Sequence, residues 1–404
     1  MPPAPGSVHV PIQARPLFVL VCLFAPIGVI AAKALVPLLF VVALWLLARR
    51  WRNGELARPF QGPLFYAAIA IAAWALISAL WALDGTAALT TFAKIAGVLL
   101  CALVILDGLQ DLRPEDGAIL GRGLTAAFIV AATILAVESL SGAAGHQWYM
   151  EWRGRGKDFH ATVLNRAEIL LLLSAWPTAY VLSQGGPGNR VGAVAVIAAA
   201  IAIIMVGVSN SNQAAALVSV IIALLAGVTG RWLQKLLAGL VVAGILVAPV
   251  LPTTVLAPER WAASFDAEHY SALHRLHIWN FAAQRIAEAP VIGWGLDAAR
   301  RIPGGDTKLP GGGNVMSVHT HNASLQIWLE LGAVGAVIFA GLLAGLWLRI
   351  GALDQQMARA AGTGLLASAL MVANLSFGIW QTWWMASLAL CGLAFMLARK
   401  VKIK

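Results

Sequence analysis

Long apolar runs recur along the whole chain, and short segments that carry most of the Lys and Arg residues separate them. Of the 404 residues, 60% are hydrophobic and only 11% are charged, with a mean hydropathy of +0.80. A soluble protein cannot hide so large an apolar fraction, whereas helices that span a bilayer require it. The sequence therefore predicts an all-α integral membrane protein, with residues 1–404 forming a single polytopic membrane domain.

The apolar runs also predict the number of spans. Segments of about 17–25 apolar residues match the thickness of a bilayer, and we expect about 12 transmembrane helices. Two of the segments, 34–48 and 212–229, are near the short limit. The expected segments are 16–32, 34–48, 63–83, 87–105, 117–138, 166–184, 190–208, 212–229, 232–251, 322–348, 358–378 and 381–398.

The distribution of positive charge predicts the orientation. Basic residues follow every even-numbered segment: Arg49 to Arg58, Arg113, Arg190, Arg231 with Lys235, Arg349 with Arg359, and Arg399 to Lys404. Positive residues in short loops mark the cytoplasmic side, so both termini are expected inside the cell and the protein in the bacterial inner membrane. This placement also explains the net charge of +10 without a nucleic-acid partner.

Two further observations narrow the class. Cys22, Cys101 and Cys391 all lie in apolar runs, which argues against disulfides and cysteine-based metal sites. No small-residue cleavage site follows the first apolar run, which is expected to be a retained helix rather than a signal peptide.

Two loops on the opposite, periplasmic side break the charge rule. The loop at 139–165 contains Arg153, Arg155 and Lys157, with Arg166 at the start of the next segment. The loop at 252–321, between the ninth and tenth helices, contains six basic residues: Arg260, Arg275, Arg285, Arg300, Arg301 and Lys308. A long loop escapes the rule, but arginines gathered outside also indicate an anionic ligand at the outer membrane face.

The long loop is expected to be partly helical. The stretch from Ser271 reads as a helix with that residue as its cap and Pro290 as its stop. Leu276, Trp279, Ala283 and Ile286 recur at helical spacing, which suits a helix that lies on the membrane surface over a cavity. Glycine clusters at 293–295, 304–305 and 311–313 then indicate turns.

The motif His319-Thr-His321-Asn322 stands where the long loop re-enters the membrane. A histidine at such a position can act as a general base near neutral pH, and the alternative is a set of wettable interface residues. His319 and His321 with His274 and His277 also allow a zinc reading. Zinc sites usually include Cys or a carboxylate, and the neighbouring arginines would repel a cation, so we predict no metal.

Basic residues supply the candidate anion binders. Arg275 and Arg166 are the strongest, since guanidinium groups bind phosphate bidentately. The alternatives are a solvated helix face for Arg275 and an interfacial snorkelling residue for Arg166. Arg153 and Arg155 are candidates for steering ligands or are merely solvated.

Lys94 lies about two turns inside its apolar segment, where a charge is costly. We expect it to pair with Glu138 or Glu168 or to contact a lipid phosphate.

Three stretches of the chain resemble the O-antigen ligase and polymerase superfamily of bacterial envelope glycosyltransferases. The stretches are Leu164-Asn-Arg166-Ala-Glu-Ile, Ser271-Ala-Leu-His-Arg275-Leu-His-Ile-Trp279 with Gly293-Trp-Gly295, and His319-x-His321-Asn322 with Glu330-x-Gly332-x-x-Gly335. Their order and spacing, with the late long loop, extend the resemblance over most of the chain.

The resemblance implies a GT-C-type, metal-independent glycosyltransferase that needs no cofactor. The implied donor is an undecaprenyl-pyrophosphate-linked glycan, and in the ligases the acceptor is a sugar of lipid A–core. The family's histidine corresponds to His321 and its loop arginine to Arg275. Many members have Ser-Arg at the start of the eighth helix, where this chain reads Ser209-Asn-Ser-Asn212, and Arg166 is the candidate that replaces that arginine.

His319, Asn322 and His274, with Arg153, Arg155 and Lys94, are then expected to contact the pyrophosphate or the acceptor. A polymerase or a protein O-oligosaccharyltransferase of the same superfamily is the nearest alternative function. A transporter is the alternative from another class, but no internal repeat is visible, and the polar groups lie at the outer face rather than at the midplane.

Overall fold

The computed structural model describes residues 11, 14–55, 58–156, 160–264, 270–309 and 312–401. These residues form helices and the turns that join them, and their one isolated β-bridge links Lys308 and Asn314. The predicted all-helical fold is therefore confirmed. Lys157, Gly311, Lys402 and Lys404 lie outside the described residues.

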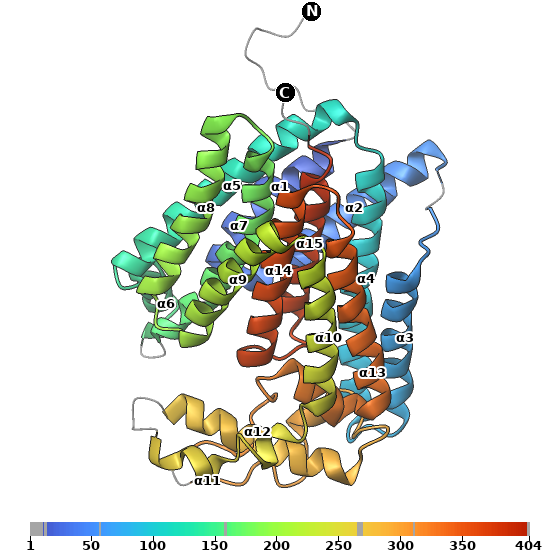
Figure 1. Ribbon diagram of the computed structural model, residues 1–404, viewed down its shortest axis with the longest axis vertical. Helices are drawn as coiled ribbons and strands as arrows, with labels where there is room; N and C mark the ends of the chain where they lie inside the picture. Colours follow the sequence, from blue (N-terminus) through green and yellow to red (C-terminus); the bar gives the residue numbers. More distant parts are fainter. Residues whose placement is uncertain are drawn as a thin grey trace, which may run out of the picture.

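Each of the predicted apolar segments coincides with a helix (Figure 1). These helices are α1 (Arg15–Ala31), α2 (Leu35–Asn53), α3 (Pro63–Ile77), α4 (Gly85–Gln110), α5 (Pro114–Leu140), α7 (Asn165–Ser183), α8 (Pro187–Val206), α9 (Asn210–Thr229), α10 (Trp232–Val247), α13 (Ala323–Gly351), α14 (Gln356–Leu375) and α15 (Thr382–Ala398).

Eight candidate spans in the described part of the chain are long and apolar enough to cross a membrane, and the first of them joins α1 and α2. Helices α10 and α15 are apolar but shorter. The length and apolar composition of these helices indicate a multi-pass membrane protein, and the count of twelve crossings stays a prediction.

The loops contain the remaining helices. Helix α12 (Tyr270–Glu288) confirms the helix predicted from Ser271 to the residue before Pro290. A short helix α6 (Ala144–Trp152) lies in the loop 139–165 and was not predicted from the sequence. The short α11 (Pro258–Trp261) precedes α12, and in Figure 1 both lie across one end of the bundle.

Local sequence explains where several helices begin. Pro63 and Pro187 occupy the first turns of α3 and α8, where a missing N–H is tolerated. The side chains of Asp84, Ser209 and Asn322 accept backbone N–H groups in the first turns of α4, α9 and α13.

One end of the bundle, which we name the basic end, collects the segments that follow the even-numbered spans. Arg49, Arg50 and Arg58 of the α2 end contact Asp107 and Asp111 of the α4 end. Further contacts join the ends of α7, α9 and α15 to this side: Gln184 to Ala398, Lys400 to Leu109, Tyr180 to Gln355 and Gln356 to Gly227. The predicted alternation of sides is confirmed, and its assignment to the cytoplasm stays a prediction.

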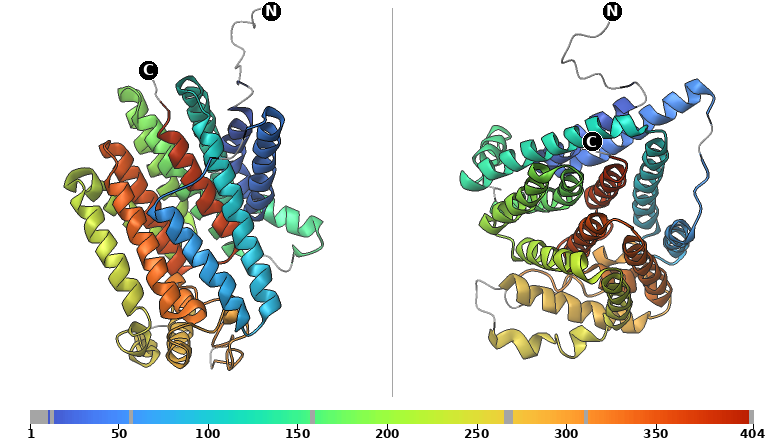
Figure 2. Two further views of the ribbon diagram at one scale, coloured as in Figure 1. Left: turned by 90° about the vertical axis from the view of Figure 1, so that its right-hand side faces the viewer. Right: turned by 45° about the horizontal axis from the view of Figure 1, so that its top comes forward.

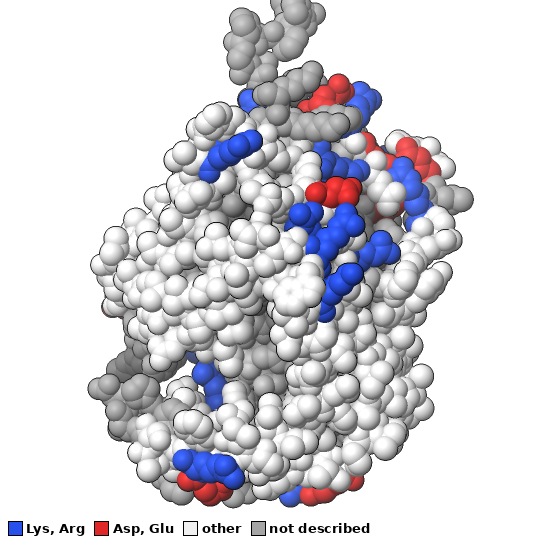
Figure 3. All heavy atoms as spheres, in the orientation of Figure 1, with Lys and Arg blue, Asp and Glu red and all other residues white. Residues whose placement is uncertain are grey.

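The opposite end, which we name the loop end, carries α11, α12 and the His319–His321 turn. Between the two ends, the visible surface is nearly free of charged side chains (Figure 3). This distribution is what a lipid-exposed belt requires.

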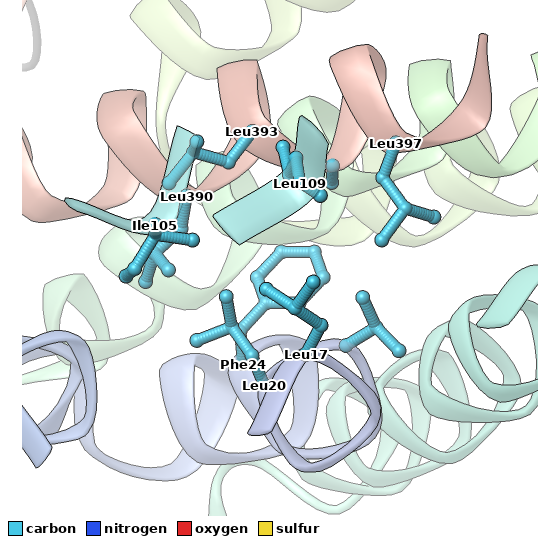
Figure 4. Close-up of a pocket in the computed structure, with 10 residues that line it drawn as sticks. Leu17, Leu20, Phe24, Ile105, Leu109, Leu390, Leu393 and Leu397 are labelled. Carbon is cyan, nitrogen blue, oxygen red and sulfur yellow. The ribbon is translucent and has the colours of Figure 1, made fainter. Parts of the chain in front are cut away.

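Apolar packing fills the bundle near the basic end. Figure 4 shows a small apolar pocket between α1, α4 and α15 that contains none of the predicted site residues. Its labelled residues are Leu17, Leu20, Phe24, Ile105, Leu109, Leu390, Leu393 and Leu397.

Two glycine motifs interlock at the loop end. Gly332 interrupts α13 with φ 63°, and a Cβ there would lie 2.3 Å from the carbonyl oxygen of Val291. Gly293 has φ 71°, and its Cβ would lie 2.6 Å from the backbone of Glu330. Backbone N–H groups of Trp294 and Gly295 donate to the carbonyls of Leu329 and Glu330. The loop after α12 is therefore fixed directly onto the break in α13.

Candidate functional site

His321 is held in a strained backbone conformation with its ring fixed. Its φ is 53°, a left-handed value that is rare for a residue with a Cβ. Nδ1 lies 2.5 Å from the carbonyl oxygen of Ser376, between α14 and α15. A carbonyl only accepts, so Nδ1 carries the hydrogen and Nε2 of the neutral ring has a free lone pair.

His319 stabilises the turn that contains His321. It is buried, its Nδ1 accepts the backbone N–H of His321 at 3.1 Å, and the two ring centroids are 4.1 Å apart. Burial first, and then the charges of His321, Arg300 and Arg275, lower the pKa of His319 to about 3. Its geometry suits positioning of His321 rather than proton transfer.

Burial also lowers the pKa of His321 to about 4, opposed by the hydrogen bond to Ser376 and assisted by the charge of Arg275. Both imidazoles are therefore neutral at physiological pH. A neutral His321 keeps its Nε2 lone pair available to accept a proton.

Arg275 projects from α12 toward the bundle. Its Nη1 donates to Ser211 Oγ at 3.3 Å, and no carboxylate among the described residues pairs with it. Burial lowers the pKa of this guanidinium. Trp279 on the same helix donates to the carbonyl of Thr320 at 2.9 Å, which fixes α12 against the His319–His321 turn.

Arg166 lies in the first turn of α7. Its Cζ is 5.2 Å from the centroid of the Trp383 ring, and in the described part of the chain no acidic side chain pairs with it. The start of α7 packs on the start of α9, because Asn212 Nδ2 donates to the carbonyl of Asn165 at 2.9 Å and to Glu168 at 2.6 Å. Arg166 therefore lies beside the start of α9, where this chain lacks the arginine that many members of the superfamily have.

A chain of contacts brings the three predicted catalytic residues to one corner. Ser211 accepts from Arg275 and donates to the carbonyl of Leu375 at 3.4 Å. The next residue after Leu375 is Ser376, which holds His321. Ser211 itself precedes Asn212, which contacts the first turn of α7. Figure 3 shows a basic side chain in a hollow of the surface between the bundle and its lower layer.

The other predicted contact residues have defined partners. Asn322 caps α13, with its Oδ1 accepting the N–H of Leu325 at 3.0 Å. His274 Nε2 lies 2.8 Å from the carbonyl oxygen of Asn314. The carboxamide oxygen of Asn322 thus has a structural role, and only its amide group is free to contact a ligand.

Arg153 and Arg155 lie at the exposed end of α6, where Arg153 Nη1 donates to the hydroxyl of Tyr149 at 3.4 Å. The structure places both residues on the loop 139–165.

The prediction that Lys94 pairs with Glu138 or Glu168 is wrong. Lys94 is exposed on α4, while Glu138 accepts the backbone N–H groups of Gly145 and His146, and Glu168 accepts from Asn212. Hydropathy located the depth of this residue but not the face of the helix on which it lies.

Glu330 was not predicted as a site residue, although it lies in the motif that carries the resemblance. Its side chain is completely buried and accepts from three donors: Gln326 Nε2 at 3.0 Å, the N–H of Asp297 at 2.7 Å and Trp380 Nε1 at 2.6 Å. Gln326 in turn accepts the N–H of Ile379 at 3.1 Å. The carboxylate therefore ties α13 to the long loop and to the α14–α15 turn that contains Ser376.

Of the histidines in the zinc reading, His274 contacts the carbonyl of Asn314, whereas His321 contacts the carbonyl of Ser376 and the ring of His319. No group of three or more His, Cys, Asp or Glu side chains within the described ranges is placed to hold a metal ion.

Comparison with known proteins finds similarity to one family and to several proteins. The O-antigen ligase family matches residues 194–340, a range that includes Ser211, Arg275 and His321 but not Arg166. A Rickettsia conorii protein, provisionally named a polysaccharide ligase, is 32% identical over 157 residues, which cover 38% of each chain.

Two other relatives with the same provisional name match over a longer range. The proteins from Rickettsia typhi and Rickettsia prowazekii are each 25% identical, over 347 and 349 residues, covering 82% of this chain and 79% of theirs.

Proposed function

We propose that this protein, which is of the O-antigen ligase type, transfers a glycan from undecaprenyl pyrophosphate to a sugar hydroxyl of lipid A–core. One observation carries the proposal: Arg275 and Arg166 lie in the same corner as His321. Neither arginine has an acidic partner in the described residues, and the neutral histidine has a free Nε2. Such a corner suits an anionic leaving group beside a hydroxyl that must lose a proton.

The reaction is a single inverting displacement. The acceptor hydroxyl oxygen attacks the anomeric carbon, the bond from that carbon to the pyrophosphate oxygen breaks, and the hydroxyl proton passes to His321 Nε2. Arg275 and Arg166 hold the departing undecaprenyl pyrophosphate and stabilise its developing charge. The glycosyl–pyrophosphate bond that breaks is already activated, so the step consumes no ATP, and the two arginines take the place that a metal ion would have at the leaving group.

Donor binding also activates the base. The charge of Arg275 contributes to the low pKa of His321. A bound pyrophosphate neutralises that charge, which raises the basicity of the histidine when the donor is in place. Proton transfer is thereby favoured in the complex over the free protein.

The location follows from the same proposal. The loop end faces the periplasm, the basic end faces the cytoplasm, and the fold is of the GT-C type with both lipid-linked substrates arriving from the inner membrane. The charge-poor belt between the two ends supports a position in the bilayer (Figure 3), and the Lys and Arg residues in the short loops of the basic end support its cytoplasmic side.

The test uses a null strain that lacks this protein and is complemented with wild type, His321→Ala or Arg275→Ala. Wild type is expected to restore glycan-bearing lipopolysaccharide, and both variants are expected to fail while reaching the membrane at normal levels. Arg285→Ala is the matched control, because Arg285 lies on the same helix as Arg275 but pairs with Glu288 at 3.0 Å.

The outcomes separate the alternatives. If wild type changes only glycan chain length, the polymerase function replaces the ligase. Glycan found on protein instead of lipid A–core would assign protein O-glycosylation, and solute movement without glycan transfer in vesicles would assign transport. Full activity of His321→Ala would refute the general-base role.

A further inference from the structure

A polar cavity lies in the long loop beside the His319–His321 turn. It has a volume of about 290 Å³, and its lining comes from residues 299–306 together with Asn314 and Met316. Pockets that hold small ligands have volumes of roughly 300–1,000 Å³. The cavity therefore has room for a sugar unit rather than for a polymer.

The lining offers both hydrogen-bond donors and acceptors. Arg300 Nε contacts Asp297 at 3.0 Å, and Arg301 pairs with Asp84, yet about half of each arginine side chain is exposed. A guanidinium has more N–H donors than one carboxylate uses. Asp306, which is exposed in the same lining, supplies acceptor oxygens. This mixture suits a hydroxyl-rich ligand better than a phosphate.

The cavity adjoins the candidate catalytic residues. Asn314 in its wall contacts His274, the neighbour of Arg275 on α12. Ser317, next to Met316 of the lining, donates to the carbonyl of His319 at 2.7 Å. Arg300 is close enough to His319 to add to the effect of burial on the pKa of that ring.

The cavity lies toward one flank of the bundle, and the corner where Arg275, Arg166 and His321 meet lies toward the other. Arg301 in the cavity wall pairs with Asp84, the cap of α4, whereas Arg166 and Ser211 belong to α7 and α9. Figure 2 shows α3 and α4 on one flank and α7 to α9 on the other. In an inverting displacement the nucleophile and the leaving group lie on opposite sides of the anomeric carbon, and binding sites on opposite flanks are consistent with that arrangement.

We infer that this cavity binds the sugar of the acceptor that carries the attacking hydroxyl, next to the His319–His321 turn and opposite the pyrophosphate site. The inference rests on the proposed function and deepens it by locating the acceptor. It also assigns Asp306 and Arg300 to recognition of acceptor hydroxyl groups.

Thiol protection tests the inference without relying on catalysis. The full-length Asp306→Cys protein is labelled in detergent with a bulky, charged maleimide, in the presence of lipopolysaccharide truncated to lipid A–core or of the undecaprenyl-pyrophosphate-linked glycan. Wild type gives the background, because Cys22, Cys101 and Cys391 lie in helices and none is exposed. Pro303→Cys, in the same lining, is the second reporter, and the exposed Gln284→Cys on α12 is the control outside the cavity.

Truncated lipopolysaccharide at ten times its dissociation constant is expected to slow labelling of both cavity variants about tenfold, with no effect on the control. The donor alone is expected to leave the rate unchanged. In a parallel assay, Asp306→Asn is expected to raise the acceptor KM several-fold and to leave the donor KM unchanged.

Protection by the donor alone would overturn the inference by assigning the cavity to the donor glycan. An absence of protection by either lipid would remove the cavity from substrate binding. If lipid A–core protects but wild type transfers no glycan to it, the binding site stands and the proposed function fails, so the two failures are distinguishable.

Discussion

Arginines occur at both ends of the bundle, but their surroundings differ. At the basic end, the side chain of Arg50 is buried and lies 2.8 Å from Asp107 and 3.2 Å from Asp111, and Arg49 and Arg58 share these carboxylates. At the loop end, Arg275 has a hydroxyl partner and Arg166 an aromatic ring. The same residue type thus links helices where its charge is balanced and is left available to an anion where it is not.

The largest effects should separate the two kinds of arginine. Replacement of Arg50 with Ala removes the partner 2.8 Å from the buried Asp107 and leaves Arg58 at 3.6 Å, and we expect a loss of up to about 3–5 kcal/mol of stability. Arg166→Ala removes no carboxylate partner, so the protein should stay folded while transfer falls about 10²–10³-fold. Thermal unfolding in detergent and single-turnover glycan transfer measure the two changes.

A double replacement sharpens this comparison. Arg50→Met combined with Asp107→Leu should recover most of the stability lost in Arg50→Ala, because an apolar pair needs no charge balance. Unfolding of Arg166→Ala as severe as that of Arg50→Ala would contradict the distinction between the two ends.

The next effect concerns proton transfer. His321→Gln should lower kcat/KM about 10²–10⁴-fold. Since the pKa of His321 is about 4, the ring of the free wild-type protein is neutral above that pH, and kcat/KM should fall only as the pH drops toward 4. A pH profile of purified protein checks this, and an acid limb near 6.5 that disappears in His321→Gln would show an unshifted histidine.

A smaller effect is expected at Glu330. In Glu330→Gln, one oxygen that accepts hydrogen bonds becomes an amide that donates, so a donor such as Trp380 loses its acceptor. We expect about 1–3 kcal/mol of destabilisation and a transfer rate reduced through displacement of the turn that holds His321. Unfolding and kcat are measured together, and Gln284→Ala, at an exposed position of α12, serves as the control.

The smallest effect is expected at Lys94. Since this side chain is exposed on α4 inside an apolar span, where a charge is costly, Lys94→Leu should not lower the stability and should leave glycan transfer unchanged. A large loss of transfer with normal expression would return Lys94 to the candidate substrate-binding residues.

Local patterns in the sequence sufficed for much of the fold. Apolar periodicity and Pro290 defined α12, and the runs between basic segments defined the helices of the bundle. Helix α6 was missed because its sequence, which includes Trp148 and Glu151, has no apolar stripe of sufficient length. Asn322 could have been predicted as a cap, since it directly precedes the apolar run of α13.

The site was only partly accessible from the sequence, because its decisive contacts join distant segments. Arg275 and Ser211 are 64 residues apart, and His321 and Ser376 are 55 residues apart. No local pattern specifies such pairs. The motif around Glu330 was visible, and Gln326 lies one turn away on the same helix, but the other two donors, Asp297 and Trp380, come from distant segments that only the folded chain brings to α13.

The left-handed backbone at His321 has a consequence for engineering and for natural variation. A residue with a Cβ loses roughly 1–2 kcal/mol in that conformation, and glycine does not. Glycine at this position would relieve the strain while removing the imidazole. Selection for thermal stability alone would therefore tend to discard the histidine. A variant that is more heat-resistant but inactive would reveal a trade-off between stability and turnover at this residue.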